Sequence, residues 1–215
     1  SRGAVGNILI PLEEAVPIPE EAVKTVEHVI TSMNVVLAQI IPGLTIRIET
    51  LGEMVFANGN KGVKIQLMSL KNEKAIPLKY ESEGIKKIIS ILQLLIVVYN
   101  RSSITVAIDE LDAGVFEYLL GELLCIISEK GKGQLIFTSH NLRPLETLDR
   151  GFIAFTTTNP SNRYIRMSNI KDNNNLRDFY FRDIILGEQS EELYDPTNNS
   201  EIALAFREAG EASGS

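Results

Sequence analysis

Cysteine, tryptophan and histidine are scarce in this chain of 215 residues, which contains one cysteine, no tryptophan and two histidines. The single cysteine, Cys125, can form neither an internal disulfide nor a zinc site built on several cysteines. This scarcity excludes a small secreted domain held together by disulfides and favours a reducing compartment. The N-terminus also lacks a basic stretch followed by an apolar one, so we expect no leader peptide and a cytoplasmic location.

Long hydrophobic runs are missing as well. The longest apolar stretch, Ile88–Tyr99, has twelve residues and is interrupted by Ser90 and Gln93, whereas a membrane-spanning helix needs about 20. We therefore expect no membrane segment. Hydrophobic residues make up 44% of the chain and charged residues 23%, which is the balance of an ordinary globular protein with a buried core.

Clusters of positive charge are also absent. The formal net charge is -7, and seven acidic residues but only one base, Arg207, follow Gly187. A segment with this charge repels a phosphate backbone. Nucleic acid stays open as a partner, but the charge pattern predicts no dedicated DNA-binding face.

The hydrophobic residues that are present change their period along the chain. Apolar residues at helical spacing predict an amphipathic helix over 19–41, with Pro19 in its first turn. Alternation then predicts an antiparallel meander. Its strands are expected near 44–48, 63–67 and 76–80. The first part of the chain should therefore be a helix next to a β meander.

After Ser82 the pattern becomes helix, strand, helix, strand. These elements are expected over 83–100, 104–109, 114–129 and 134–138. A strand joined through a helix to a parallel strand forms a right-handed unit, and continuous apolar runs indicate strands covered on both faces. The fold class predicted is α/β, with a parallel-sheet core flanked by helices. Weaker patterns predict a short helix near 142–148, a hairpin within 151–167 and helices near 175–185 and 200–208.

Acidic residues follow the first apolar strand. Asp109 and Glu110 come directly after it, and Asp112 two residues later. Ligands of parallel sheets bind beyond the carboxyl ends of the strands, so these acids are candidates for chemistry. Asp109 can hold a magnesium ion through its waters, and Glu110 can polarise an attacking water. The alternative is that the acids only mark the point where the strand enters solvent.

His140 follows the second apolar strand, after Thr138 and Ser139. Because the two strands should be neighbours, His140 is expected at the same sheet edge as Asp109. There it can donate a hydrogen bond to a terminal phosphate or hold an attacking water. A surface or capping role is the alternative.

The stretch ESEGIKK, residues 81–87, opens the second predicted helix. Ser82 suits the N-cap, and the free amides of Glu83 and Gly84 suit an anion. Gly84 would also let a phosphate approach the backbone closely. An ordinary serine cap is the alternative for this stretch taken alone.

In this order, ESEGIKK, a strand with DELDAG and a strand with TSH resemble the C-terminal lobe of ATP-binding-cassette type heads in SMC-like, RecF-like and OLD-like ATPases. The motifs look more narrowly like AAA-family ATPases of that type linked to bacterial phage defence. The resemblance implies a homodimer that closes around ATP and Mg²⁺, in phage defence or DNA maintenance. It gives the residues these roles: Ser82, Glu83 and Gly84 in the signature motif that contacts the opposing subunit's nucleotide, Asp109 and Glu110 as the Walker B pair, Asp112 as the D-loop acid, and His140 as the switch histidine.

Two features depart from that family. The signature is not LSGGE, because Glu81 replaces the leucine, Glu83 the first glycine and Ile85 the closing glutamate. The Walker A phosphate loop, G-x-x-x-x-G-K-[ST], does not occur in the 215 residues. Without that loop the chain cannot hold ATP in a site of its own. We therefore expect a fragment that is inactive alone and becomes an ATPase with a Walker A lobe from the same protein or another chain.

Four segments are expected on this basis: a linker or foreign stretch at 1–18, the helix and meander at 19–80, the ATPase C-terminal lobe at 81–187, and an acidic segment at 188–215. Other functions stay open. A Mg²⁺-dependent nuclease or Toprim-like domain would use Asp109, Glu110 and Asp112 as a metal site. A degenerate head would be an interaction module without catalysis. A helicase lobe would leave ESEGIKK without a role.

Overall fold

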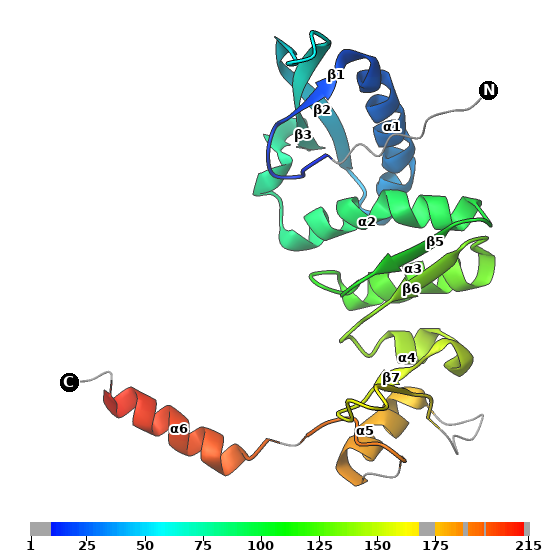
Figure 1. The fold of residues 1–215 in the computed structure, drawn as a ribbon, viewed down its shortest axis with the longest axis vertical. Coiled ribbons are helices and arrows are strands. Elements are labelled where there is room, and N and C mark those ends of the chain that lie inside the picture. The colour runs from blue at the N-terminus through cyan, green and yellow to red at the C-terminus, as the bar shows by residue number, and fades with distance from the viewer. Residues whose placement is uncertain (1–9, 168–174, 187–188, 196, 213–215) are drawn as a thin grey trace. The chain divides into compact units, whose positions relative to one another are not determined.

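The computed structural model of the chain describes residues 10–167, 175–186, 189–195 and 197–212 (Figure 1). These residues belong to two compact units, which divide between Asn141 and Leu142. The division falls inside the predicted lobe 81–187. Residues 1–9 of the expected linker and the expected boundary at 187–188 lie outside the described residues.

The predicted helices and strands occur in the predicted order, with most boundaries shifted, but a further strand at Val16–Pro19 was not predicted and begins inside the expected linker 1–18. The first unit contains β1 (Val16–Pro19), a 3-10 turn (Glu20–Ala22), α1 (Val23–Ile40), β2 (Leu44–Val55), β3 (Lys61–Lys71), β4 (Lys74–Pro77), a 3-10 turn (Leu78–Tyr80), α2 (Glu83–Asn100), β5 (Thr105–Ile108), α3 (Glu117–Lys130) and β6 (Gln134–Phe137). The second unit contains α4 (Pro144–Thr147), a 3-10 turn (Arg150–Phe152), β7 (Phe155–Thr156), β8 (Tyr164–Ile165), α5 (Leu176–Leu186) and α6 (Asn199–Ala212).

An antiparallel sheet is built around β3. The whole length of β3 pairs with β2, while β1 and β4 pair with successive stretches of its other edge. The prediction for Pro19 was wrong, because Pro19 ends β1 opposite Gly62 and the α-helix begins only at Val23. Proline donates no amide hydrogen and is tolerated in such an edge strand. The sequence pattern did not show that β3 offers a free edge there.

The helix α1 packs against β2 (Figure 1). Its buried residues recur every three or four positions, as predicted: Val26, Ile30, Met33 and Leu37. Asn34 adds a polar tie, because its side-chain amide donates to the carbonyl of Ile46 and its oxygen accepts from the amide of Ile46, both at 2.8 Å. The tie fixes where the helix sits along β2.

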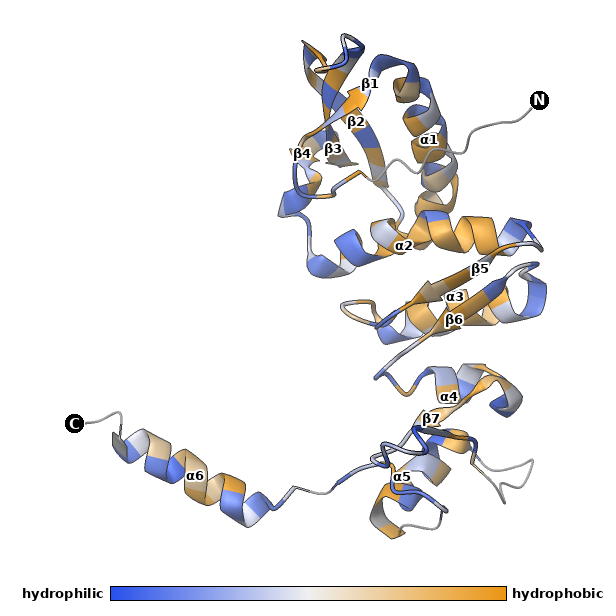
Figure 2. Cartoon of the chain, viewed as in Figure 1, coloured by the Kyte–Doolittle hydropathy of each residue, from blue (hydrophilic) through white to orange (hydrophobic). Residues whose placement is uncertain are grey.

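The helix α2 contacts α1, α3 and β5. Much of its C-terminal half is hydrophobic (Figure 2), and its buried apolar residues are Ile88, Ile89, Ile91, Leu92, Leu95 and Val98. A helix that is apolar around much of its circumference is covered on several sides. The helix α2 therefore joins the meander and the second sheet into one core.

The second sheet confirms the predicted parallel pairing, from Thr105 opposite Gln134 to Ile108 opposite Phe137. It has only these two strands within the described part of the chain. Alternate residues on one face are exposed, and Ile136 is 53% exposed. The expectation that both faces are covered was therefore wrong for this chain, because α2 and α3 do not reach that face.

The second unit is smaller. The predicted hairpin within 151–167 is confirmed as the short pair β7 and β8. The helix α5 lies against it, with the rings of Phe155 and Tyr180 stacked at a centroid distance of 5.3 Å. All residues of α6 are exposed up to 211. Among the described residues, no helix combines the length and the hydrophobicity needed to span a bilayer.

Candidate functional site

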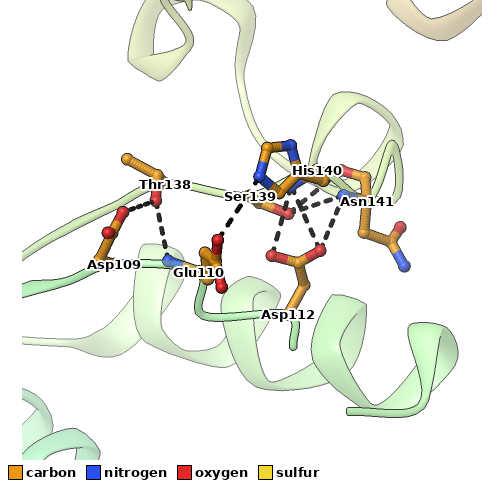
Figure 3. Close-up of polar contacts among 7 residues, drawn as sticks. All are labelled: Asp109, Glu110, Asp112, Thr138, Ser139, His140 and Asn141. Carbon is orange, nitrogen blue, oxygen red and sulfur yellow. Dashed lines mark hydrogen bonds and ion pairs between the residues drawn. The ribbon is translucent and has the colours of Figure 1, made fainter. Parts of the chain in front are cut away.

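Two neighbouring strand ends bring the predicted residues together (Figure 3). The ladder continues one step past the strands, where the amide of Thr138 donates to the carbonyl of Ile108 at 3.1 Å. The hydroxyl of Thr138 then donates to the carboxylate of Asp109. The prediction that Asp109 and His140 lie at one sheet edge is confirmed, because both follow the paired ends of β5 and β6.

Glu110 turns the chain sharply at this edge. Its φ angle is 47°, in the left-handed region that residues other than glycine seldom adopt. The Thr138 hydroxyl oxygen accepts a hydrogen bond from the Glu110 amide at 2.8 Å, and this contact supports the turn. The Glu110 Oε1 atom lies 3.9 Å from His140 Nε2, and both side chains are exposed. Because both side chains are exposed, both groups stay accessible to a ligand.

Asp112 has a role that the sequence did not reveal. Its carboxylate accepts hydrogen bonds from the backbone amides of His140, at 3.2 Å, and Asn141, at 2.9 Å. The loop from β6 is also closed by Ser139, whose hydroxyl accepts from the Asn141 amide at 3.1 Å. Asp112 therefore holds the loop that carries His140.

The donor set at this edge suits magnesium better than a metal held by the protein alone. Asp109 and the Thr138 hydroxyl supply oxygen atoms, and Mg²⁺ commonly takes one or two carboxylates together with waters and substrate phosphates. No cluster of three or more His, Cys, Asp or Glu residues able to hold a metal occurs in the described part. Because the Asp112 carboxylate binds backbone amides, a metal site of three acids is not formed here.

The start of α2 holds the other predicted residues. Ser82 is exposed and caps the helix, its hydroxyl oxygen accepting from the Ile85 amide at 3.4 Å, as predicted. Gly84 is half-buried rather than exposed. A Cβ atom at Gly84 would lie only 2.4 Å from the carbonyl oxygen of Gly114. Glycine is therefore required here by a close backbone contact between α2 and the turn after β5.

Lys86 is a buried charge that sequence reasoning missed. Its ammonium lies 2.7 Å from Glu13 and 2.6 Å from Glu83. The hydrogen bonds to Glu13 and Glu83 raise the pKa of Lys86, and that to Lys86 lowers the pKa of Glu13. A shallow cavity of about 450 Å³ lies among these residues and Gly114. Only the spacing of Glu83 and Lys86 on one helical turn could have signalled the pair.

The site residues thus form two groups in the first unit. One group is at the strand ends: Asp109, Glu110, Asp112, Thr138 and His140. The other is at the start of α2: Ser82, Glu83 and Gly84. The contact between Gly84 and Gly114 joins the two groups.

The comparisons with known proteins found similar structures but no match by sequence. No protein-family model matches the chain, and no curated protein matches it. Two solved SMC heads, one bound to the C-terminal winged-helix domain of ScpA and one from Pyrococcus furiosus bound to the C-terminal domain of ScpA, have TM-scores of 0.40 and 0.39 at 15% and 12% identity. The matches cover 54% and 56% of this chain, and 35% and 30% of the two solved chains. Both scores are too low to support the fold by themselves.

A further solved chain gives a stronger match. It comes from work on the ATP-driven dimerisation and DNA-stimulated activation of SMC ATPases. The TM-score is 0.52 at 14% sequence identity, and the match covers 78% of this chain and 96% of that one. The chain therefore has a mixed α/β fold similar to that of an SMC ATPase head.

Proposed function

We propose that this chain is the C-terminal part of an ATPase head that hydrolyses ATP between two heads. The observation that carries the proposal is the meeting of Asp109, Glu110 and His140 at the carboxyl ends of two parallel strands. An acid for magnesium, an acid for water and an imidazole are groups that can position Mg²⁺, an attacking water and a phosphate. The fold similarity supports the same function.

Each group has one part in the proposed reaction. Asp109 would hold Mg²⁺, which would neutralise charge on the phosphates. Glu110 accepts hydrogen bonds from the attacking water and orients it, and His140 donates a hydrogen bond to the terminal phosphate. Thr138 keeps the Asp109 carboxylate in place through its hydroxyl.

The start of α2 acts on the nucleotide of a second copy. Ser82 is exposed, and the amides of Glu83 and Gly84 belong to a helix N-terminus, which favours phosphate. Gly114 belongs to the turn that carries Asp112, and it lies against Gly84. These residues therefore form one surface that a bound nucleotide on another head can meet. DNA maintenance or phage defence is the setting we propose for such a dimer.

The Walker A lobe docks on the second sheet. One face of β5 and β6 is exposed, and its residues are Thr105, Ala107, Gln134 and Ile136. Each of the two strands has one neighbouring strand among the described residues. Parallel sheets are normally covered on both faces. A lobe that adds strands and covers Ile136 would complete the sheet and bring a phosphate loop to Asp109.

The test is ATP turnover by the chain alone and by the chain combined with the polypeptide that supplies the Walker A lobe. We expect no turnover alone and Mg²⁺-dependent turnover in the combination. Glu110→Gln should lower turnover by at least about 100-fold and trap an ATP-bound dimer, whereas Asp109→Asn should weaken Mg²⁺-dependent ATP binding. Ser82→Arg should abolish the dimer and leave ATP binding measurable. Glu122→Gln, an exposed change on α3, is the control.

Other outcomes point to other functions. A combined preparation that neither turns over ATP nor responds to the substitutions would leave the interaction module. Cleavage of DNA by the chain alone with Mg²⁺ or Mn²⁺, lost in Asp109→Asn, would instead support a nuclease. The engagement of Asp112 by backbone amides argues against that result.

A further inference from the structure

Three polar or charged side chains of the described residues are buried, and two of them hold the acids on either side of Ser82. Ser69 is completely buried, and its hydroxyl donates to Glu81 at 2.6 Å. Lys86 is 8% exposed and lies 2.6 Å from Glu83. Burying a polar group costs free energy unless it is hydrogen-bonded. The contacts to Glu81 and Glu83 therefore offset the cost of burying Ser69 and Lys86.

The antiparallel sheet fixes the position of Ser69. This residue lies near the C-terminal end of β3, between Ile46 of β2 and Ile76 of β4. Its hydroxyl is 3.4 Å from the Ile76 carbonyl oxygen but 2.6 Å from Glu81 Oε1. The shorter contact has the length of a charge-assisted hydrogen bond, so Glu81 is the main acceptor.

Glu81 connects Ser69 to Ser82, because it is bonded to Ser69 and directly precedes Ser82 in the chain. The Glu81 amide donates to the Leu78 carbonyl at 3.0 Å, which closes the turn leading into α2. The backbone of Glu81 is thus held by the turn and its side chain by Ser69. Ser82 follows directly and caps α2. The contacts give a structural role to Glu81, which stands where the signature motif it resembles has leucine.

We propose that Ser69 is a positioning residue, which sets the position of Ser82 at the start of α2 through its hydrogen bond to Glu81. The meander sheet thereby determines the geometry of the surface that meets a second copy. The use of that surface toward a nucleotide rests on the proposed function, but the positioning itself does not.

The test measures amide hydrogen exchange by NMR on the chain alone. The reporters are the amides of Ile85 and Lys86, which bond to the hydroxyl and the carbonyl of Ser82. Ser69→Ala should make both exchange about tenfold faster, because a hydrogen bond to a charged group is lost. Glu81→Ala should give the same acceleration, and the double variant should add little to either single one.

Two controls separate positioning from general loosening. Ile65→Val shortens another fully buried side chain of β3 and lowers global stability without touching Glu81. Ser90→Ala removes an exposed hydroxyl of α2 that donates to the Lys87 carbonyl at 2.7 Å. Both should leave the two reporter amides unchanged after correction for global stability.

Two results overturn the proposal. One is equal acceleration by Ser69→Ala and Ile65→Val, and the other is additive acceleration in the double variant. A separate measurement of ATP-dependent dimerisation with the Walker A lobe judges the proposed function. If wild type fails to dimerise while the exchange results hold, the proposed function fails and the positioning role of Ser69 stands.

Discussion

Glu110 combines a candidate catalytic carboxylate with an unfavourable backbone conformation. At a φ of 47°, a side chain costs about 1 kcal/mol that glycine avoids. Active sites commonly retain such local strain when the surrounding contacts hold it in place. Here the Thr138 hydroxyl provides the contact, through the Glu110 amide.

This strain gives a prediction on stability. Glu110→Gly should be more stable than Glu110→Ala by about 1 kcal/mol, although both lose the carboxylate. Urea unfolding of the two variants measures the difference. At Glu122, an exposed position inside α3, the order should reverse, because glycine costs about 1 kcal/mol relative to alanine in a helix. Equal stability of the two Glu110 variants would contradict the strained turn.

The strand-end residues were the most predictable part of the site. Asp109 and His140 could be placed together because short apolar runs reveal strands and parallel strands end at one edge. The bonds of Thr138 and Asp112 could not be predicted. They depend on the turn that Glu110 makes, and a left-handed glutamate leaves no signal in the sequence.

At the scale of elements, the type and order of most helices and strands could be predicted from the sequence, whereas their first and last residues were predicted less well. Alternation reveals the strands of a meander, but not that β2 continues to Val55 through exposed positions or that β3 continues to Lys71 through the buried Met68 and Ser69. Pro19 was misplaced because its partner, Gly62, is distant in the sequence. Ser69 contacts Glu81, and Glu13 contacts Lys86, from distant positions in the sequence, so neither contact leaves a local pattern.

The approach of α2 to the turn after β5 makes Gly84 irreplaceable. Gly84→Ala would place a Cβ atom 2.4 Å from the Gly114 carbonyl oxygen, which forces the backbone to move. We expect a loss of about 1–3 kcal/mol in unfolding free energy, as for overpacking in a core. Gly52→Ala is the matched control, since nothing lies within 4 Å of the added atom. Thermal unfolding compares the two, and an equal change in both would contradict the close contact.

The contact between Glu13 and α2 predicts a dependence on pH. Lys86 lowers the pKa of Glu13 from 4.5, so the contact stabilises the folded chain above that pH. The contribution is lost as the pH falls below 4.5 through the lowered value, because Glu13 then becomes protonated in the folded state. Glu13→Gln should therefore destabilise the chain at pH 7 and have little effect well below the lowered pKa.

Urea unfolding of wild type and Glu13→Gln between pH 7 and pH 2 measures this difference. The neighbouring acid provides the control, because Glu14→Gln removes the same charge from an exposed side chain. A destabilisation by Glu13→Gln that persists unchanged at acid pH would contradict an ionic contact.

At the scale of the whole molecule, the second sheet is the least complete feature. Two parallel strands whose outer edges pair with no other described strand, together with an exposed Ile136, offer other chains a template for pairing. The chain alone should therefore self-associate at high concentration, and the proposed Walker A lobe should suppress this by covering the same surface.

Ile136→Lys tests that surface. The substitution should reduce self-association in light scattering and weaken docking of the Walker A lobe, while changing stability by no more than about 0.5 kcal/mol. Ile126→Lys, on an exposed part of α3, adds the same charge elsewhere and should do neither. Equal effects of both substitutions would show that net charge, not the sheet face, controls association.

The meeting of Gly84 and Gly114 also constrains how this sequence can evolve. The obstacle to a side chain at Gly84 is a carbonyl oxygen, an atom that every residue carries, so no second substitution at position 114 can compensate. Gly114 itself is limited by its φ of +72° and not by crowding, and asparagine or aspartate tolerate that conformation. Among descendants that keep this contact, position 84 should remain glycine while position 114 drifts among glycine, asparagine and aspartate.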